Sequence, residues 1–295
     1  MTETLKVLVT GASGLLGDDV VRVFKNKGHE LIALRGRRDL DVTDANKTLE
    51  VVRKHRPDVV IDCVGTHDID GAESDPTNAF MNVFVAAKNV VIACKIAGAT
   101  LIHPGSDYVF DGSKDEPYLE TDLPNPVNVY GRNKWAVERF ISSILPEHFI
   151  IRVPILFGAG GKLERNFIYR IYSKIKNGET VKVASDQVTS CGYTVDIALA
   201  FEKIARSYHY GTYHLANEGF CSRYELYREV ASGLGLDAEK VIPTPSAELK
   251  RRARRPKYTV LSTLLVQKIF GIKLRPWNEA LRECLKEFRD RWNLP

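Results

Sequence analysis

A tyrosine and a lysine four residues apart, Tyr130 and Lys134, are the residues of this chain best suited to acid–base chemistry. On a helix this spacing puts both side chains on one face. A phenol with an ordinary pKa near ~10 exchanges its proton sluggishly at neutral pH, and a neighbouring ammonium lowers that pKa by favouring the phenolate. Ser106 follows a strand-like run, and its hydroxyl can donate to the oxygen that receives the proton. Beside a hydride donor, these three residues would reduce a carbonyl group.

A second pair with the same spacing, Tyr172 and Lys176, shows how weak this pattern is when it stands alone. No serine at a strand end precedes Tyr172, and the residues around it have helical periodicity. We therefore expect Tyr172 and Lys176 to lie on a structural helix face. Tyr130 differs because it begins a helix directly after a loop and has a glycine-rich segment upstream.

That glycine-rich segment, TGASGLLG at 10–17, predicts a dinucleotide site between the first strand and the first helix. Gly11 permits a tight turn, Gly14 lets the backbone approach a pyrophosphate, and Gly17 lets the helix pack closely on the strand. Free N–H groups at the start of that helix attract phosphates. The alternative is a plain strand–turn–helix joint. The expected cofactor residues here are Gly11, Ser13, Gly14, Leu15, Leu16 and Gly17.

The loop after the second expected strand, LRGRRD at 34–39, bears on which dinucleotide fits. An acidic residue there would hold the ribose 2′-hydroxyl of NADH, whereas arginine accommodates the 2′-phosphate of NADPH. Arg35 and Arg37 therefore favour NADPH, although a solvated basic loop has the same composition. Asp39 and Asp41 leave NADH as the alternative cofactor, because either carboxylate could hold the ribose 2′-hydroxyl.

Strand-like and helical patterns alternate through the first half of the chain. Strands are expected at 6–9, 30–34, 58–64, 100–103 and 149–153, and helices at 15–27, 43–56, 76–98 and 129–144. Continuous apolar strands separated by helices indicate a parallel sheet covered on both faces. We predict an α/β fold: a Rossmann-like doubly wound parallel sheet with a smaller, mostly helical C-terminal substrate domain. The NAD(P)-binding domain is expected at 1–153 with a return at about 185–217, and the substrate domain at 154–184 and 218–295.

Composition places the chain among ordinary globular proteins. The net charge of +5 is far from the dense basic stripe of a nucleic-acid binder. The first residues lack the basic head and apolar stretch of a signal peptide, and no uninterrupted apolar run reaches the ~18 residues of a membrane span. The five cysteines have neither CxxC nor Cys/His spacing, so we expect reduced thiols and no metal site. We expect a cytoplasmic protein with no nucleic-acid or membrane partner.

Together these features resemble the extended short-chain dehydrogenase/reductase superfamily and, within it, the dTDP-4-dehydrorhamnose reductase family. The segments that carry the resemblance are TGASGLLG (10–17), LDVTD (40–44), RPDVVIDCVG (56–65), IDGAESDP (69–76), SDYVFDG (106–112), NVYGRNK (128–134), NF (166–167), YHLANEG (213–219), ARRP (253–256) and LRPW (274–277). They span nearly the whole chain. The resemblance implies reduction, by NADPH or NADH, of the C4 ketone of a dTDP-4-keto-6-deoxysugar, converting dTDP-4-dehydro-L-rhamnose to dTDP-L-rhamnose.

The resemblance also implies roles position by position. Tyr130 is the proton donor, Lys134 is its partner and can hold the nicotinamide ribose, and Ser106 stands where the family has threonine or serine. The further cofactor residues that it implies are Asp41, Val42, Val64, Gly65 and Asn82. The substrate residues that it implies are His67, Ser106, Asp107, Tyr108, Asn166 and Arg255. Arg255 ends a basic run, 250–255, that either meets the diphosphate of a sugar nucleotide or forms a solvated face.

Three departures from the family pattern bear on the substrate. His67 stands where a threonine is expected, and is either a pocket group or only a loop histidine. The segment 189–194 lacks the usual proline. Tyr108 stands where related sugar dehydratases carry an acidic residue, so the base that would abstract a proton beside the ketone is missing. This disfavours a dehydratase.

Two other functions stay open. A protein similar to the regulatory subunit of methionine adenosyltransferase would bind NADP without turning over a sugar, although the intact Ser106, Tyr130 and Lys134 favour an enzyme. A nucleotide-sugar epimerase of the same superfamily would retain NAD and show no net redox change. We expect a nucleotide sugar as the small-molecule partner, and a monomer or a homodimer.

Overall fold

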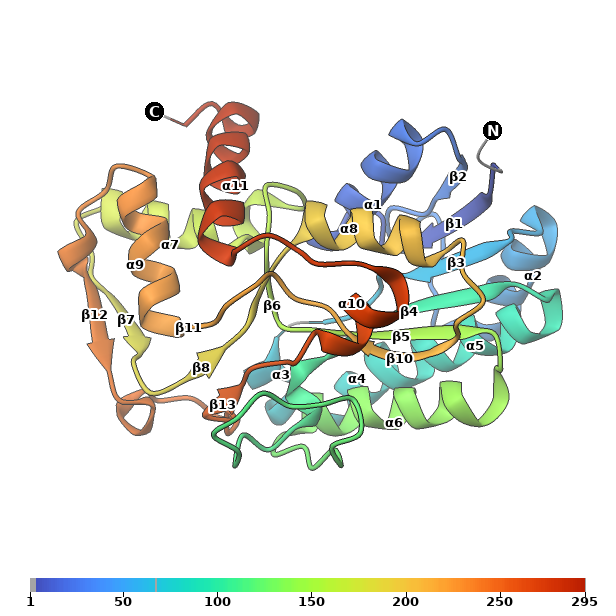
Figure 1. Cartoon of the computed structure of the whole chain (residues 1–295), viewed down its shortest axis with the longest axis horizontal. Coiled ribbons are helices and arrows are strands. Elements are labelled where there is room, and N and C mark those ends of the chain that lie inside the picture. The colour runs from blue at the N-terminus through green and yellow to red at the C-terminus, as the bar shows by residue number, and fades with distance from the viewer. Residues whose placement is uncertain (1–3, 67, 295) are drawn as a thin grey trace.

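The centre of the molecule is a six-stranded parallel sheet with the strand order β10-β5-β4-β3-β1-β2 (Figure 1). We describe it from a computed structural model that covers residues 4–66 and 68–294. The strands are β1 (Lys6–Thr10), β2 (Glu30–Ala33), β3 (Val59–Asp62), β4 (Thr100–Ser106), β5 (His148–Val153) and β10 (Gly211–His214). The predicted doubly wound α/β fold is confirmed.

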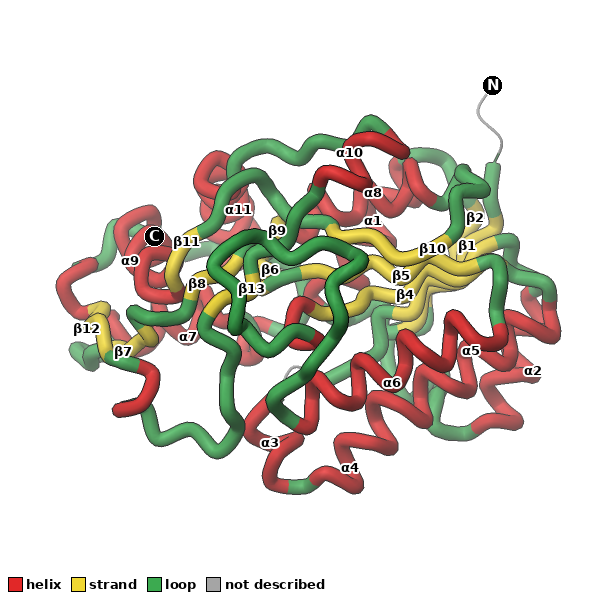
Figure 2. Tube along the Cα trace, turned by 60° about the horizontal axis from the view of Figure 1, so that its bottom comes forward, coloured by secondary structure: helices red, strands yellow, loops and turns green. Residues whose placement is uncertain are grey.

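Helices cover both faces of the sheet, and Figure 2 shows these layers on opposite sides of the strands. One layer holds α1 (Leu15–Asn26), α8 (Thr194–Ile204) and α10 (Leu264–Phe270); the other holds α2 (Ala45–His55), α5 (Ala86–Ala97) and α6 (Val129–Ile144). Alternation along each strand feeds both layers, because successive side chains point to opposite faces. In β1, Val7 and Val9 join the core under α1 and α8, whereas Leu8 joins the core under α2, α5 and α6.

The predicted long helix at 76–98 is a composite. It runs through α4 (Pro76–Phe80), a π-helical turn (Met81–Val85) and α5, after the short helix α3 (Ile69–Ser74). By length and composition, 76–97 is apolar enough to cross a membrane, but half of that stretch is buried in the protein, as in the core helices of many globular proteins. The π turn is the one place where this helix departs from regular geometry, and such turns are frequent at functional sites.

A second core forms beside the sheet from the later part of the chain. Its helices are α7 (Phe167–Lys176), α9 (Arg223–Gly233) and α11 (Trp277–Trp292). Short strand pairs accompany them: β6 (Ile155–Phe157) with β9 (Cys191–Tyr193), β7 (Val181–Ala184) with β12 (Val241–Thr244), and β8 (Val188–Thr189) with β11 (Cys221–Ser222) and β13 (Tyr258–Thr259). Turns of 3-10 helix lie at Asp107–Val109, Leu163–Arg165, Ala238–Lys240 and Ser246–Glu248. Ser222 and Glu225 form a capping box at the start of α9.

The chain crosses between the two cores more than once. β10 adds to the sheet edge beside β5, and α8 lies along α1. Val266 of α10 and the nearby Ile272 also belong to the core around the sheet. The division of 1–153 and 185–217 from the remaining segments stays a prediction, and the packing of 264–274 shows how closely the two parts interleave.

Candidate active site

The carboxyl edge of the sheet brings Ser106 and Tyr130 into contact. Ser106 is the last residue of β4, and Tyr130 is the second residue of α6. Asn128 caps α6 by accepting a hydrogen bond of 2.8 Å from the Gly131 N–H, which fixes where this helix begins. The Ser106 hydroxyl then hydrogen-bonds to the Tyr130 phenol.

The phenol of Tyr130 keeps its proton at neutral pH. Burial raises the pKa of Tyr130 to about 12, and the hydrogen bond with Ser106 opposes this only in part. The sequence predicted the reverse, a pKa lowered by Lys134. That prediction is wrong for the protein alone, because the ring is desolvated and Lys134 directs its ammonium to other groups.

Lys134 lies one helical turn after Tyr130 and points at β4. Its Nζ donates to the Pro104 carbonyl at 2.6 Å and lies 3.4 Å from Nε2 of His103. Burial lowers the pKa of Lys134, while the carboxylates of Asp62 and Glu138 raise it. The ammonium is therefore held inside the protein by fixed acceptors.

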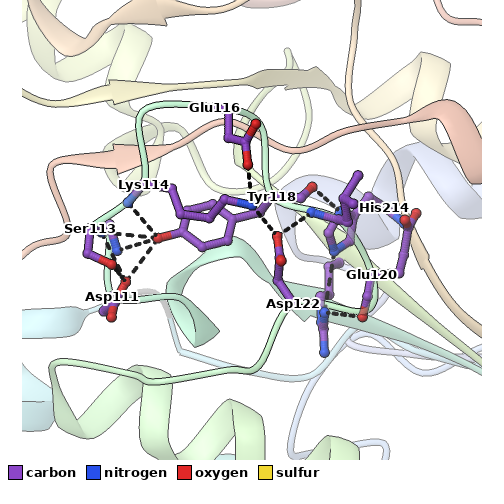
Figure 3. A network of polar contacts seen from close by, with 11 residues as sticks. Asp111, Ser113, Lys114, Glu116, Tyr118, Glu120, Asp122 and His214 are labelled. Atoms are coloured by element: carbon purple, nitrogen blue, oxygen red, sulfur yellow. Dashed lines mark hydrogen bonds and ion pairs between the residues drawn. The ribbon is translucent and has the colours of Figure 1, made fainter.

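A polar network centred on Tyr118 orders the loop that connects Ser106 to α6 (Figure 3). The Tyr118 hydroxyl donates to Asp111 at 2.9 Å and accepts from the Gly112 and Ser113 N–H groups. Its carbonyl oxygen lies 3.1 Å from Nδ1 of His214 on β10. The network thus connects this loop to β10 at the edge of the sheet.

The glycine-rich loop has the backbone shape that a dinucleotide needs. Gly11 has a φ of 62°, and a Cβ there would lie 2.6 Å from the Cys63 carbonyl oxygen. A Cβ on Gly17 would clash with the Gly11 carbonyl. Gly14 precedes α1 without any side-chain cap, so the first N–H groups of α1, from Leu15, Leu16 and Gly17, are free of a capping side chain. This cradle fits a pyrophosphate.

Two more loops border this cradle. Ser13 donates its hydroxyl to the Arg35 carbonyl, which ties the glycine loop to the end of β2. Glycines 160 and 161 lie against the start of α1, where a Cβ on Gly161 would be 3.0 Å from the Leu15 nitrogen. No sequence pattern pointed to this second contact.

The predicted NADPH arginines are exposed, and they meet acidic and amide groups. Arg37 donates to Asn82 at 2.5 Å and lies 3.8 Å from Asp41, while Arg35 lies 3.9 Å from Asp18. Asn82, in the π turn, is therefore brought beside the β2 loop. Val42 is buried in the core, and its carbonyl accepts from Asn89 at 2.9 Å.

The segment after β3 lies next to the glycine loop. Val64 and Gly65 follow Asp62, and a Cβ on Gly11 would be 2.9 Å from the Val64 nitrogen. Gly65 is exposed. His67 lies outside the described residues.

On the substrate side, Asp107 and Tyr108 are buried beside Ser106. Asp107 accepts from Ser106 and from Thr189, each at 3.3 Å. Burial raises the pKa of Asp107 to about 6, although hydrogen bonds from Thr259, Ser106 and Thr189 oppose the shift. Thr189 belongs to the segment that lacks the family proline, and its hydroxyl lies against Asp107.

Asn166 and Arg255 both have structural partners. Asn166 caps α7 and donates to the Gly158 carbonyl at 2.8 Å. Arg255 forks onto both carboxylate oxygens of Asp70, at 3.1 and 2.9 Å. The Arg255–Asp70 pair connects a late segment of the chain to α3. Direct substrate contact by Asn166 or Arg255 stays a prediction.

Within 4–66 and 68–294, no group of three or more His, Cys, Asp or Glu side chains is arranged to hold a metal ion.

The second tyrosine–lysine pair lies on α7, where the Tyr172 ring packs against the second core and Lys176 Nζ lies 5.8 Å from the centre of that ring. That is a helix face, as predicted.

The RmlD substrate binding domain family matches residues 5–290. The chain belongs to this family. A dTDP-4-dehydrorhamnose reductase from Streptomyces griseus is 37% identical over 94% of this chain and 91% of its own length. A dTDP-4-keto-6-deoxy-D-glucose reductase from Streptomyces niveus is 33% identical over 94% of this chain and 95% of its own. The crystal structure of dTDP-4-dehydrorhamnose reductase from Bacillus anthracis in complex with NADP has a TM-score of 0.91 at 29% identity, and covers 97% of this chain and 100% of that one.

In this member of the RmlD family, sequence analysis overlooked three buried groups around the site. Asp62 and His103 stand behind Lys134, and Asn89 holds the 42–43 backbone. Each lies in a helix or strand whose apolar pattern dominated its interpretation. The signal that could have found them is a polar residue at a position that the periodicity makes fully buried, since such residues need partners.

Proposed function

We propose that this chain reduces the C4 ketone of a dTDP-4-keto-6-deoxysugar, dTDP-4-dehydro-L-rhamnose, with NADPH in the cytoplasm. The observation that carries the proposal is the contact of Ser106 with Tyr130 at the carboxyl edge of the sheet, with Lys134 one helical turn further along α6, in a chain of the RmlD family. The glycine cradle supports a dinucleotide at the same edge.

When bound, the dinucleotide supplies the hydride that the carbonyl carbon receives. Tyr130 donates its phenolic proton to the carbonyl oxygen, and a pKa of about 12 ensures that this proton is present at neutral pH. The Ser106 hydroxyl, bonded to the phenol, donates to the same oxygen and fixes its position. The Lys134 ammonium, one turn along the helix, stabilises the phenolate that remains after transfer.

The cofactor preference rests on the loop after β2. Arg35 and Arg37 are exposed, and their partners Asp18, Asn82 and Asp41 hold them beside the end of β2. An arginine can exchange such partners for a 2′-phosphate, with which it forms charge-assisted bonds. The cofactor residues that we assign are those of the glycine loop with Arg35, Arg37, Asp41, Val42, Val64, Gly65 and Asn82.

On the substrate side we assign Ser106, Asp107 and Tyr108 to the sugar, because they adjoin the Tyr130 phenol. Tyr108 offers a phenol where a dehydratase needs a base, which favours simple reduction. His67, Asn166 and Arg255 complete the proposed substrate set.

Turnover tests the proposal directly. The protein is mixed with NADPH or NADH and dTDP-4-keto-6-deoxy-D-glucose, with and without a 3,5-epimerase, while loss of the reduced nicotinamide is recorded. We expect oxidation of NADPH only when the epimerase is present. Oxidation of NADPH without the epimerase would show that the substrate is the unepimerised sugar. Absence of sugar-dependent oxidation with either dinucleotide would refute the reductase.

A further inference from the structure

A chain of buried polar groups runs behind Lys134 through the sheet. Asp62 ends β3, His103 lies within β4, and both residues are only 2% exposed. Nδ1 of His103 is 3.2 Å from Asp62 Oδ2, and its Nε2 is 3.4 Å from the Lys134 Nζ. His103 alternates with Ile102, so its ring points to the face that α6 covers.

The chemistry of the partners determines which atom carries each proton. The Lys134 ammonium has only donors, so Nε2 of His103 must accept. The remaining ring proton therefore sits on Nδ1 and is donated to Asp62. The other oxygen of Asp62 accepts from the Thr10 hydroxyl at 2.6 Å and from the Val64 N–H at 3.4 Å. Asp62 thus accepts from three groups, as an ionised carboxylate does.

The charges around this chain of groups are balanced. Glu138, one turn further along α6, forms an ion pair with Arg152 of β5 at 2.9 Å. Among the described ion pairs, Asp62 contacts no lysine or arginine directly. Lys134 is the cation that it reaches, through His103. Burial and the Lys134 charge lower the pKa of His103, so the ring stays neutral at neutral pH. Burial raises the pKa of Asp62, but His103, Thr10 and Lys134 lower it below its usual value. The thiol of Cys63 also faces Lys134, and burial raises its pKa, so it stays uncharged.

We propose that Asp62 and His103 are positioning residues that orient the Lys134 ammonium and keep it charged, in the way a buried acid orients a histidine in hydrolytic triads. The inference rests on the proposed function, because that function gives Lys134 its role. Thr10 is the last residue of β1 and the first of the glycine-rich segment, and it pairs in register with Asp62. The buried polar groups therefore join the strand that begins the cofactor cradle to the helix that carries Lys134.

Three variants of the full-length protein and one matched control test this arrangement. Asp62→Asn removes the charge at nearly constant shape. His103→Leu interrupts the row of polar groups, and His103→Gln restores a group that can donate to Asp62 and accept from Lys134 together. The control, Asp196→Asn, makes the same change at a buried carboxylate bound to Asn217 and Arg275, away from Lys134.

The first readout needs no turnover. Ring ¹⁵N spectra of the protein without ligands, with His103 assigned from its loss in His103→Gln, should show a neutral Nδ1–H tautomer from about pH 6 to about pH 9. An Nε2–H tautomer, or titration of this ring near pH ~6.5, would overturn the inference. NADPH affinity, measured from nicotinamide fluorescence, should fall several-fold in Asp62→Asn and His103→Leu, and much less in His103→Gln and Asp196→Asn.

The second readout is the pH dependence of turnover. Without the Asp62 carboxylate the pKa of Lys134 drops further, so the alkaline limb of kcat in Asp62→Asn should move to lower pH by about one pH unit. At pH values above the alkaline limbs of both proteins, kcat of Asp62→Asn should be about 10-fold below that of the wild type, while KM for the sugar changes by less than about threefold. A kcat profile that matches Asp196→Asn would show that the buried polar groups are only structural and overturn the inference. If the wild-type protein turns over no sugar, the proposed function fails, and the tautomer and the NADPH affinities still decide the inference.

Discussion

The ring of Tyr108 stands edge-on to the ring of Tyr130, with centroids 6.0 Å apart and planes at 76°. Tyr108 is buried, and its hydroxyl hydrogen-bonds to Arg223 at the start of α9. Tyr130, the proposed proton donor on α6, is therefore packed against a ring that contacts the second core. A movement of α9 would therefore shift Tyr108 and change the packing against the Tyr130 ring.

Tyr130→Phe should lose turnover while the protein keeps its fold. Removal of the proton donor costs about 10²–10⁴ in kcat, because the alkoxide then takes its proton from solvent. Tyr172→Phe is the matched control, since it makes the same change in the second tyrosine–lysine pair. Steady-state kinetics and circular dichroism of both variants check this. Near-normal turnover in Tyr130→Phe would remove Tyr130 from the mechanism.

Gly17→Ala should damage both stability and dinucleotide affinity. The new methyl group would collide with the Gly11 carbonyl, which cannot move without distorting the loop. Overpacking of this kind costs about 1–3 kcal/mol. Gly36→Ala is the control, because nothing lies within 4 Å of a Cβ there. Denaturant melts and NADPH titrations of the two variants should differ clearly, and equal behaviour would contradict the packing argument.

Asp107→Asn should lose activity. Its stability relative to the wild type should increase as pH rises. The folded-state pKa of Asp107 is about 6, above the unfolded value, so this group favours folding below about pH 4 and loses that contribution as pH rises through 6. Each unit by which the folded-state pKa exceeds the unfolded value corresponds to roughly 1.4 kcal/mol of folding free energy. Asparagine does not titrate, so the variant lacks this pH dependence. Melting temperatures of both proteins at about pH 4.5 and about pH 7.5 test the sign. The melting temperature of Asp107→Asn, relative to that of the wild type, should rise from the lower pH to the higher one. A relative fall would contradict the raised pKa of Asp107.

The Tyr118 loop should loosen in acid. Hydrogen bonds from Ser113, Asn125 and Tyr118 outweigh burial and lower the pKa of Asp111 to about 2. Because the folded-state value lies below the unfolded one, its stabilisation is present above about pH 4 and is lost as pH falls toward about 2. The protection factors of amides 111–118, which allow for the slower intrinsic exchange in acid, should fall over that range in the wild type. In Asp111→Asn the exchange should already be fast at neutral pH, and protection there would count against the network.

The Arg255–Asp70 pair separates two roles of Arg255. As a partly exposed ion pair it should contribute about 1 kcal/mol, so a double-mutant cycle of Arg255→Ala and Asp70→Ala should give a coupling of that size. If Arg255 also meets the diphosphate, Arg255→Ala raises KM for the sugar nucleotide much more than Asp70→Ala does. Equal KM values in the two variants would leave Arg255 with the structural role alone.

Local patterns in the residue order were enough to predict the sheet, the glycine cradle and the group of Ser106, Tyr130 and Lys134. These patterns are apolar runs of strand length, glycines spaced as in dinucleotide-binding loops, and an i, i+4 pair after a loop. The helix at 129–144 was predicted with the bounds that the structure has, and in the structure Asn128 caps it. Most of the strands of two to four residues beside the second core were missed, because so few residues carry no periodicity.

What surrounds the reacting groups became known only from the folded chain. The pKa of Tyr130 rises because of burial, and neither the neighbours that bury its ring nor the acceptors of the Lys134 ammonium are adjacent to them in sequence. Asp62 and His103 lie on different strands, 41 residues apart, and meet because those strands are paired. Electrostatic energies depend on distance and solvent exposure, and both are properties of the three-dimensional arrangement rather than of the order of residues.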